Sequence, residues 1–253
     1  MKQKPTILIC NDDGIGADGI KALAKEIKKF ANVIVAAPHT QQSAVGHSIT
    51  MSSPIRVKEV PVFKNLNGYA IEGTPADSVK LAVHTLLKDR KIDLLISGIN
   101  QGANTAINTI YSGTVSAATE GTILGIPSIA ISLTSYTYTD FSLASKFASR
   151  IAKVVIKNRL PKGTLLNVNV PAIKKIKGVK ITRQGKSSWD DTYEIRTDPG
   201  NRKYYWLTGS MKKIDKTMDF DVKVVDEGYI SVTPIHYDLT DYKMFEEMQS
   251  WKI

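Results

Sequence analysis

The sequence predicts an α/β fold, a doubly wound and mostly parallel sheet that is followed by a β-hairpin extension and a terminal helix. The first observation is that short apolar, β-branched runs alternate with segments of helical periodicity as far as residue 170, an order typical of parallel α/β sheets. The second is a change after about Ile173, where Thr, Val, Tyr and Trp dominate between turn sequences. We therefore expect a core over residues 1–172 and a β-rich extension over 173–253, both within one domain.

The first elements of the core are a strand, a tight turn and a helix. Thr6–Cys10 is a short apolar run typical of a buried strand, and the glycines of 14–16 allow the turn. A helix with apolar residues on one face begins near Gly19. A second buried strand covers 33–37. Residues 39–50 show no periodicity, which predicts a long functional loop.

The middle of the core begins with strand-like segments at 55–62 and 69–71. Thr74–Asp77 then has the residues of a helix start, with Thr at the N-cap, Pro at the first helical position and an acid at the third. The remaining core elements are expected to be a strand at 94–97, a helix from Ser112 to about 124, a strand at 128–132, a helix to about 158 and a strand at 165–170.

The extension is expected to consist of hairpins rather than further strand–helix–strand units. Turn sequences occur at 198–201 and 226–228, between short strands. The aromatic run Tyr204–Trp206 is more typical of a packing or subunit surface than of a base-stacking platform. A terminal helix is expected within 238–251.

Composition narrows the classes of protein to be considered. No apolar run reaches the roughly 18 residues of a membrane helix, and the N-terminus leads directly into a strand instead of a signal peptide. The single cysteine, Cys10, cannot form an internal disulfide, which fits a reducing cytoplasm. The net charge of +10 is uneven, with +2 on residues 1–144 and +8 on 145–253. We take this as support for a phosphate-bearing substrate, and expect neither a membrane nor a nucleic-acid duplex as partner.

Two adjacent carboxylates, Asp12 and Asp13, follow the first strand. The carboxyl ends of parallel strands are where open α/β sheets bind ligands. Two carboxylates side by side in a partly buried crevice repel each other unless a cation separates them, and hard oxygen ligands favour Mg²⁺ or Mn²⁺ over zinc. The alternative is that Asp12 caps the next helix and Asp13 forms an Asx-turn.

Further oxygen-rich loops occur in corresponding places, at Ser43, at Asn100 with Asn104, and at 112–114. Because neighbouring strand ends converge, these loops can meet Asp12-Asp13 at one crevice, where a cation would polarise a phosphoryl group. Ser112, Gly113 and Thr114 offer hydroxyls and backbone N–H groups to a phosphate at a helix N-terminus.

Each of these residues also has an ordinary structural interpretation. Ser112 alone is more often an N-cap, and Asn104 can be a plain loop residue. His47 is a candidate general acid, although a lone loop histidine is more often structural or exposed. Nucleotide-binding glycine motifs, zinc motifs and a serine-hydrolase elbow are missing from the sequence.

The order of motifs along the whole chain resembles the survival protein E (SurE) family of 5′/3′-nucleotidases. The matching segments are Ile9–Gly14, Ala37-Pro38, Ser43–Thr50, Gly73–Asp77, Ser97–Asn104, Tyr111–Val115, Ala117-Ala118, Asn167–Pro171, Tyr204–Trp206 and Gly228–Pro234. The resemblance implies a Rossmann-like enzyme that hydrolyses nucleoside 5′- and 3′-monophosphates to nucleoside and phosphate, with some activity on short polyphosphate. It also implies a homodimer or homotetramer assembled through the C-terminal extension.

The resemblance implies roles for individual residues as well. One divalent cation per subunit, Mg²⁺ or Mn²⁺, would be held by Asp12, Asp13, Ser43 and Asn100, and the two aspartates would be catalytic. We expect the substrate to contact Asn11, Gly46, His47, Asn104, Ser112, Gly113 and Thr114. One departure is 198–202, where the family often has Pro-Arg-Gly. Because it lies in the expected ribbon, it weakens the resemblance for substrate preference or assembly more than for the metal site.

We interpret the chain as a metal-dependent phosphomonoesterase acting on nucleoside monophosphates. An aspartyl-phosphate phosphatase is disfavoured, because Asp12 and Asp13 are adjacent rather than arranged as Asp-x-Asp. The non-enzymatic alternative is a nucleotide sensor in which the metal only anchors phosphate.

Overall fold

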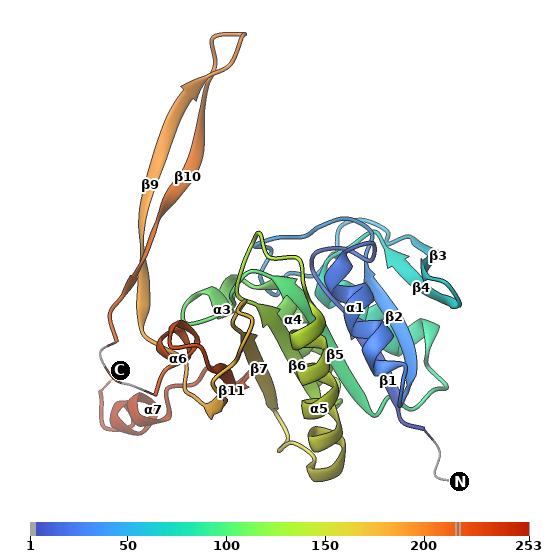
Figure 1. The fold of residues 1–253 in the computed structure, drawn as a ribbon. Helices are drawn as coiled ribbons and strands as arrows, with labels where there is room; N and C mark the ends of the chain where they lie inside the picture. The colour runs from blue at the N-terminus through green and yellow to red at the C-terminus, as the bar shows by residue number, and fades with distance from the viewer. Residues whose placement is uncertain (1–3, 216, 218, 253) are drawn as a thin grey trace.

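The computed structural model describes residues 4–215, 217 and 219–252. A nine-stranded sheet has the order β3-β4-β2-β1-β5-β6-β7-β11-β8 (Figure 1). Its strands are β1 (Thr6–Cys10), β2 (Asn32–Pro38), β3 (Val57–Phe63), β4 (Leu66–Ile71), β5 (Leu94–Gln101), β6 (Ser128–Leu133), β7 (Thr164–Val170), β8 (Val179–Ile181) and β11 (Ile230–His236). Among the described strands of this sheet, the pairs β3–β4 and β7–β11 are antiparallel and the others parallel. The predicted mostly parallel sheet is therefore confirmed.

Helices flank this sheet. They are α1 (Asp18–Ile27), α2 (Pro75–Leu81), continued by the π-helical turn η1 (Ala82–Leu86), α3 (Asn108–Tyr111), α4 (Gly113–Ile123), α5 (Ser142–Asn158), α6 (Asp221–Asp226) and α7 (Tyr242–Met248). Helix α1 packs against α5, and α2 packs against α4. Figure 1 shows α1 and α5 together in front of the sheet. Among the described residues, no helix has the length and apolarity to cross a membrane.

Local sequence explains why the site-bearing elements form where they do. Residues 7–10 of β1 are buried on both faces, as expected for a central parallel strand. At the start of α2, the Thr74 hydroxyl accepts a hydrogen bond from the Asp77 amide (3.0 Å), and the Asp77 carboxylate accepts one from the Thr74 amide (2.9 Å). This reciprocal pair is a capping box, so the predicted helix start is confirmed.

The extension agrees with the prediction in part. Strands β9 (Ser187–Thr197) and β10 (Lys203–Lys213) form the expected antiparallel ribbon, which projects far from the sheet (Figure 1). The terminal helix is confirmed as α7, shorter than expected. Strands β8 and β11, however, are not hairpin strands, because they join the edge of the main sheet beside β7. Short Val- and Ile-containing runs carry no information about which sheet they join.

Candidate functional site

The site begins where β1 ends, at Asp12. Its side chain is buried, with 6% of the residue exposed, and one carboxylate oxygen accepts a hydrogen bond from the Thr114 hydroxyl of α4. Burial raises the pKa of Asp12 to about 6, with a further contribution from the neighbouring charge of Asp13, and the hydrogen bond from Thr114 acts in the opposite direction. Thr114 therefore joins α4 to the loop after β1.

The two neighbours of Asp12 are also held by backbone groups, one in the same turn and one at the end of β5. A carboxylate oxygen of Asp13 accepts a hydrogen bond from the Gln101 amide at 3.2 Å, and burial raises the pKa of Asp13. The side-chain amide nitrogen of Asn11 donates to the carbonyl of Gly14 at 2.9 Å. The buried Oδ1 of Asn11 has no hydrogen-bond partner among the described residues.

Gly113, the first residue of α4, lies directly against Asp12. A Cβ atom placed on Gly113 would lie 2.8 Å from Cβ and 3.0 Å from Oδ2 of Asp12. The Ser112 hydroxyl accepts a hydrogen bond from the Val115 amide at 3.1 Å, so Ser112 is the N-cap of α4. At Gly113 the first turn of α4 thus meets the carboxylate with backbone alone, and the next residue, Thr114, hydrogen-bonds to it through its hydroxyl.

Asn100 comes from β5, the strand next to β1. Between Ser97 and Asn100 the register of β5 against β6 shifts. The Asn100 side chain donates from Nδ2 to the Gly102 carbonyl at 2.8 Å, and 9% of the residue is exposed. This bond turns the amide nitrogen toward the protein and leaves Oδ1 as the group available to a cation.

Asn104 is part of a buried amide cluster. Its backbone amide donates to Oδ1 of Asn169 (2.9 Å), its carbonyl accepts from Nδ2 of Asn167 (2.8 Å), and its own Nδ2 donates to the Ser132 hydroxyl (2.9 Å). The cluster ties the loop after β5 to β6 and β7. These bonds use most of the hydrogen-bonding groups of Asn104, and its contact with substrate stays a prediction.

The loop after β2 carries Ser43, Gly46 and His47. Ser43 is exposed, and its hydroxyl accepts a hydrogen bond from the side chain of Gln41 at 2.9 Å. Gln42, which precedes Ser43, donates its backbone amide to the Asp12 carbonyl at 2.7 Å, so this loop lies beside the aspartates. The Gly46 amide donates to the Tyr111 carbonyl at 3.1 Å and joins the loop to α3.

His47 pairs with an acid that sequence reasoning missed. Its Nε2 lies 2.9 Å from Oε2 of Glu120, which is only 3% exposed, and Lys80 of α2 lies 2.6 Å from the other oxygen. Burial acts to raise the pKa of Glu120, but its bonds with His47 and Lys80 outweigh burial and lower it. The Nε2 of His47 is therefore occupied in anchoring the loop to α2 and α4.

Where β1 and β5 end, the structure places Gly113 and Thr114 against Asp12, and places Gln101, the neighbour of Asn100, against Asp13. Within the described part of the chain, no group of three or more His, Cys, Asp or Glu side chains could hold a metal ion. A cation at this place would therefore depend on the two aspartates together with neutral oxygen atoms.

Comparisons with known proteins agree with this architecture. The family model described as "Survival protein SurE" matches residues 7–191. The chain is 46% identical to a Christiangramia forsetii protein named "5′-nucleotidase SurE", covering 100% of this chain and 98% of that one. It is 47% identical to a protein of the same name from Syntrophobacter fumaroxidans, covering 98% and 99%. The crystal structure of the SurE protein from Aquifex aeolicus superposes with a TM-score of 0.83 at 40% identity, over 97% of this chain and 98% of that one. The chain therefore belongs to the SurE family.

Proposed function

We propose that the chain is a divalent-metal-dependent phosphomonoesterase that hydrolyses nucleoside 5′-monophosphates to nucleoside and phosphate. The observation that carries this proposal is the buried Asp12 carboxylate beside Asp13, with the glycine backbone of α4 in contact with it. Nucleoside 3′-monophosphates and short polyphosphate are further substrates that we infer from the family resemblance. The names of the relatives support the 5′ activity.

The donor set fits a hard divalent cation such as Mg²⁺ or Mn²⁺. Asp12 and Asp13 are partly or fully buried, and neither forms an ion pair with Lys, Arg or His within the described residues. The oxygen of Asn11, for which the described residues offer no hydrogen-bond partner, lies in the same turn. The residues that would hold the cation are Asp12, Asp13, Ser43 and Asn100, which offer carboxylate, hydroxyl and amide oxygens. When bound there, the cation supplies positive charge to phosphoryl oxygens.

The chain's own residues position the phosphate. Because Gly113 has no side chain, a phosphoryl group can approach the backbone N–H groups of the first turn of α4, where the helix dipole favours an anion. The Thr114 hydroxyl fixes the orientation of the Asp12 carboxylate. Hydrolysis adds water to phosphorus and breaks the ester P–O bond: one proton of the water passes to Asp12 or Asp13, and the departing nucleoside oxygen takes up a proton to leave as a hydroxyl.

We also propose that the chain forms a symmetric homo-oligomer through the extension. The β9–β10 ribbon is two-stranded, and large apolar side chains on it are exposed. They include Tyr193, Ile195, Tyr205, Trp206 and Leu207. An isolated two-stranded ribbon is marginally stable in water, so a second copy of the chain is the natural cover for these side chains.

Phosphate release from a panel of nucleoside 5′- and 3′-monophosphates, with Mn²⁺, with Mg²⁺ and with chelator, tests the proposed activity. We expect release that requires a divalent cation and is fastest with a nucleoside monophosphate. A protein that binds nucleotide with metal but releases no phosphate would instead be a sensor. A phosphorylated enzyme trapped during turnover would indicate an aspartyl-phosphate mechanism.

A further inference from the structure

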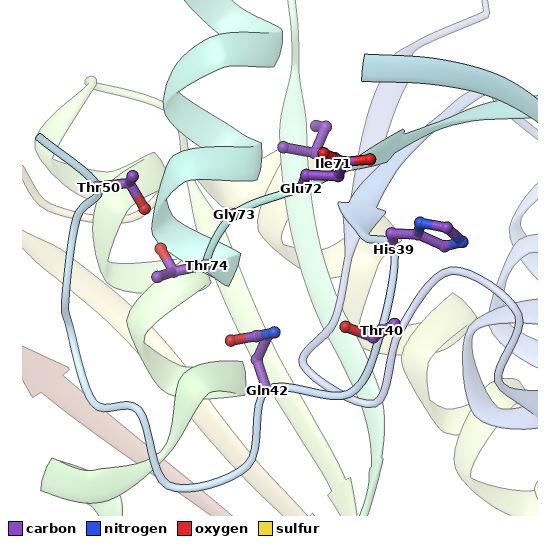
Figure 2. Close-up of a pocket in the computed structure, with 8 residues that line it drawn as sticks. All are labelled: His39, Thr40, Gln42, Thr50, Ile71, Glu72, Gly73 and Thr74. Carbon is purple, nitrogen blue, oxygen red and sulfur yellow. The ribbon is translucent and has the colours of Figure 1, made fainter. Parts of the chain in front are cut away.

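A cavity of about 410 Å³ lies at the carboxyl ends of β2 and β4 (Figure 2). Its walls come from the start of the loop after β2, from Thr50 further along that loop, and from 71–74, which lead into α2. The volume falls within the roughly 300–1,000 Å³ of small-molecule sites. The ends of β2 and β4 face the same edge of the sheet as the end of β1, which carries Asp12.

The cavity adjoins the site of the aspartates through both of its walls. In the first wall, the backbone amide of Gln42 donates to the Asp12 carbonyl at 2.7 Å. In the second wall, Thr74 is followed by Pro75, and a Cβ placed on Gly113 would lie 3.1 Å from Cγ of Pro75. A ligand with its phosphate beside Gly113 can therefore extend into the cavity.

The hydrogen-bonding groups of the cavity differ in availability. The Thr50 hydroxyl donates to Asp77 at 2.6 Å, and the Thr74 hydroxyl donates to the Ser48 carbonyl at 2.8 Å. By contrast, no hydrogen bond within the described residues uses the side chains of Thr40 and Gln42. Figure 2 shows the amide of Gln42 directed into the space between Thr40 and Thr74.

The charge of the lining indicates which half of a nucleotide fits. Lys and Arg are absent from the described residues that line the cavity, and Glu72 contributes a carboxylate. Glu72 is paired at 3.9 Å with Arg56 and with Lys58, which are not among the lining residues, so the described lining itself favours a neutral group over a second phosphate. A free amide with two donors and an acceptor, next to a free hydroxyl, matches the hydroxyl groups of a ribose and the polar edge of a base.

Resting on the proposed function, we propose that this cavity binds the nucleoside half of the substrate and that Gln42 hydrogen-bonds to it. Gln42 then determines how strongly the enzyme prefers a nucleotide over a phosphate monoester that lacks a nucleoside. The side chain of Gln42 has this role alone, because its contact with Asp12 is made by the backbone.

The test compares kcat/KM for adenosine 5′-monophosphate and for p-nitrophenyl phosphate in the wild type and in Gln42→Leu, which keeps the bulk but removes the amide. We expect the ratio of the two values to fall about tenfold, the effect of losing one or two hydrogen bonds to a neutral ligand. The matched control is Asn67→Leu, which removes an amide from an exposed position of β4 outside the cavity and should leave the ratio unchanged.

An unchanged ratio in Gln42→Leu would overturn the inference, whether both activities persist or both fall together. Binding of adenosine itself, measured by NMR, provides a readout that needs no catalysis, and we expect Gln42→Leu to weaken it. If the wild type hydrolyses neither ester, the proposed function fails. Adenosine binding that is lost in Gln42→Leu would then still support the cavity assignment, and equal binding by both proteins would refute it.

Discussion

Replacing Gly113 by alanine should disable the site while changing only one methyl group. The new Cβ would lie 2.8 Å from Cβ of Asp12, 3.0 Å from its Oδ2 and 3.1 Å from Cγ of Pro75. Pro75 is a rigid ring at the start of α2, and the carbonyl of Asp12 is held by the Gln42 amide. Rotation of the Asp12 side chain can move Oδ2 but not Cβ, so the loop after β1 and the start of α4 must move apart, which breaks the hydrogen bond between Asp12 and Thr114.

The size of the effect follows from these contacts. A hydrogen bond to a charged group contributes about 1.5–3 kcal/mol, and overpacking of this kind costs about 1–3 kcal/mol. A displacement of about 1 Å in a catalytic group lowers the rate by roughly 100-fold. We therefore expect Gly113→Ala to lose about two orders of magnitude in kcat/KM for adenosine 5′-monophosphate at saturating Mn²⁺, together with a modest loss of stability against urea.

Gly16→Ala is the matched control. Gly16 lies in the turn before α1, is exposed, and has no heavy atom within 4 Å of an added Cβ. We expect this variant to keep wild-type activity. Wild-type activity in Gly113→Ala, or an equal loss in both variants, would refute the placement of Asp12 against the first turn of α4.

Three further predictions address the metal, pH and assembly. Asp13→Asn should weaken Mn²⁺ binding in calorimetry, because one carboxylate charge is lost, whereas simple turn formation by Asp13 would leave Mn²⁺ affinity unaltered. Burial acts to raise the pKa of Asp77, but hydrogen bonds from Thr50 and Thr74 outweigh it and lower the pKa. The stabilising contribution of the Asp77 carboxylate is therefore complete above the unfolded-state pKa of about 4 and is lost as the pH falls through the lower folded-state pKa. Urea unfolding of Asp77→Asn should accordingly differ from wild type more at neutral pH than at about pH 3, and a difference independent of pH would contradict this assignment. Ending the chain after Thr240 removes the exposed Phe245 and Trp251. This truncation should reduce the particle mass measured by light scattering, while metal binding persists. A full-length protein that is monomeric at micromolar concentration would contradict the proposed assembly.

Sequence reasoning succeeded where the signal is local. The apolar run of β1 and the Thr-Pro-x-Asp start of α2 each specify their structure within a few residues, because burial pattern and capping act over that distance. The end of β1 likewise identified the place of Asp12 and Asp13, since strand ends define the ligand edge of a parallel sheet.

The contacts that orient the site could not be predicted in this way. Glu120 lies 73 positions from His47, and only the packing of α4 against the loop after β2 brings them together. Gln101 holds Asp13 with its backbone amide, a group that every residue but proline has. Gln42 carries no recognisable motif, and its significance comes from the cavity that surrounds it.

The edge of the sheet illustrates a different limit. The sequence predicts hairpins after about Ile173, yet β11 pairs with β7 and β8, and its first four residues are buried. Its alternation fits either partner, because strand pairing is decided by long-range packing rather than by the strand's own residues.

Phosphate release from adenosine 5′-monophosphate by Asp12→Asn, measured across Mn²⁺ concentrations beside the wild type, tests the central claim most directly. The substitution keeps the size of the side chain and removes a buried charge next to the phosphate position. We predict a rate that requires far more Mn²⁺ and remains at least about 100-fold below wild type at saturation. A variant that matches the wild type at limiting Mn²⁺ would show that the chemistry does not take place at the Asp12-Asp13 turn.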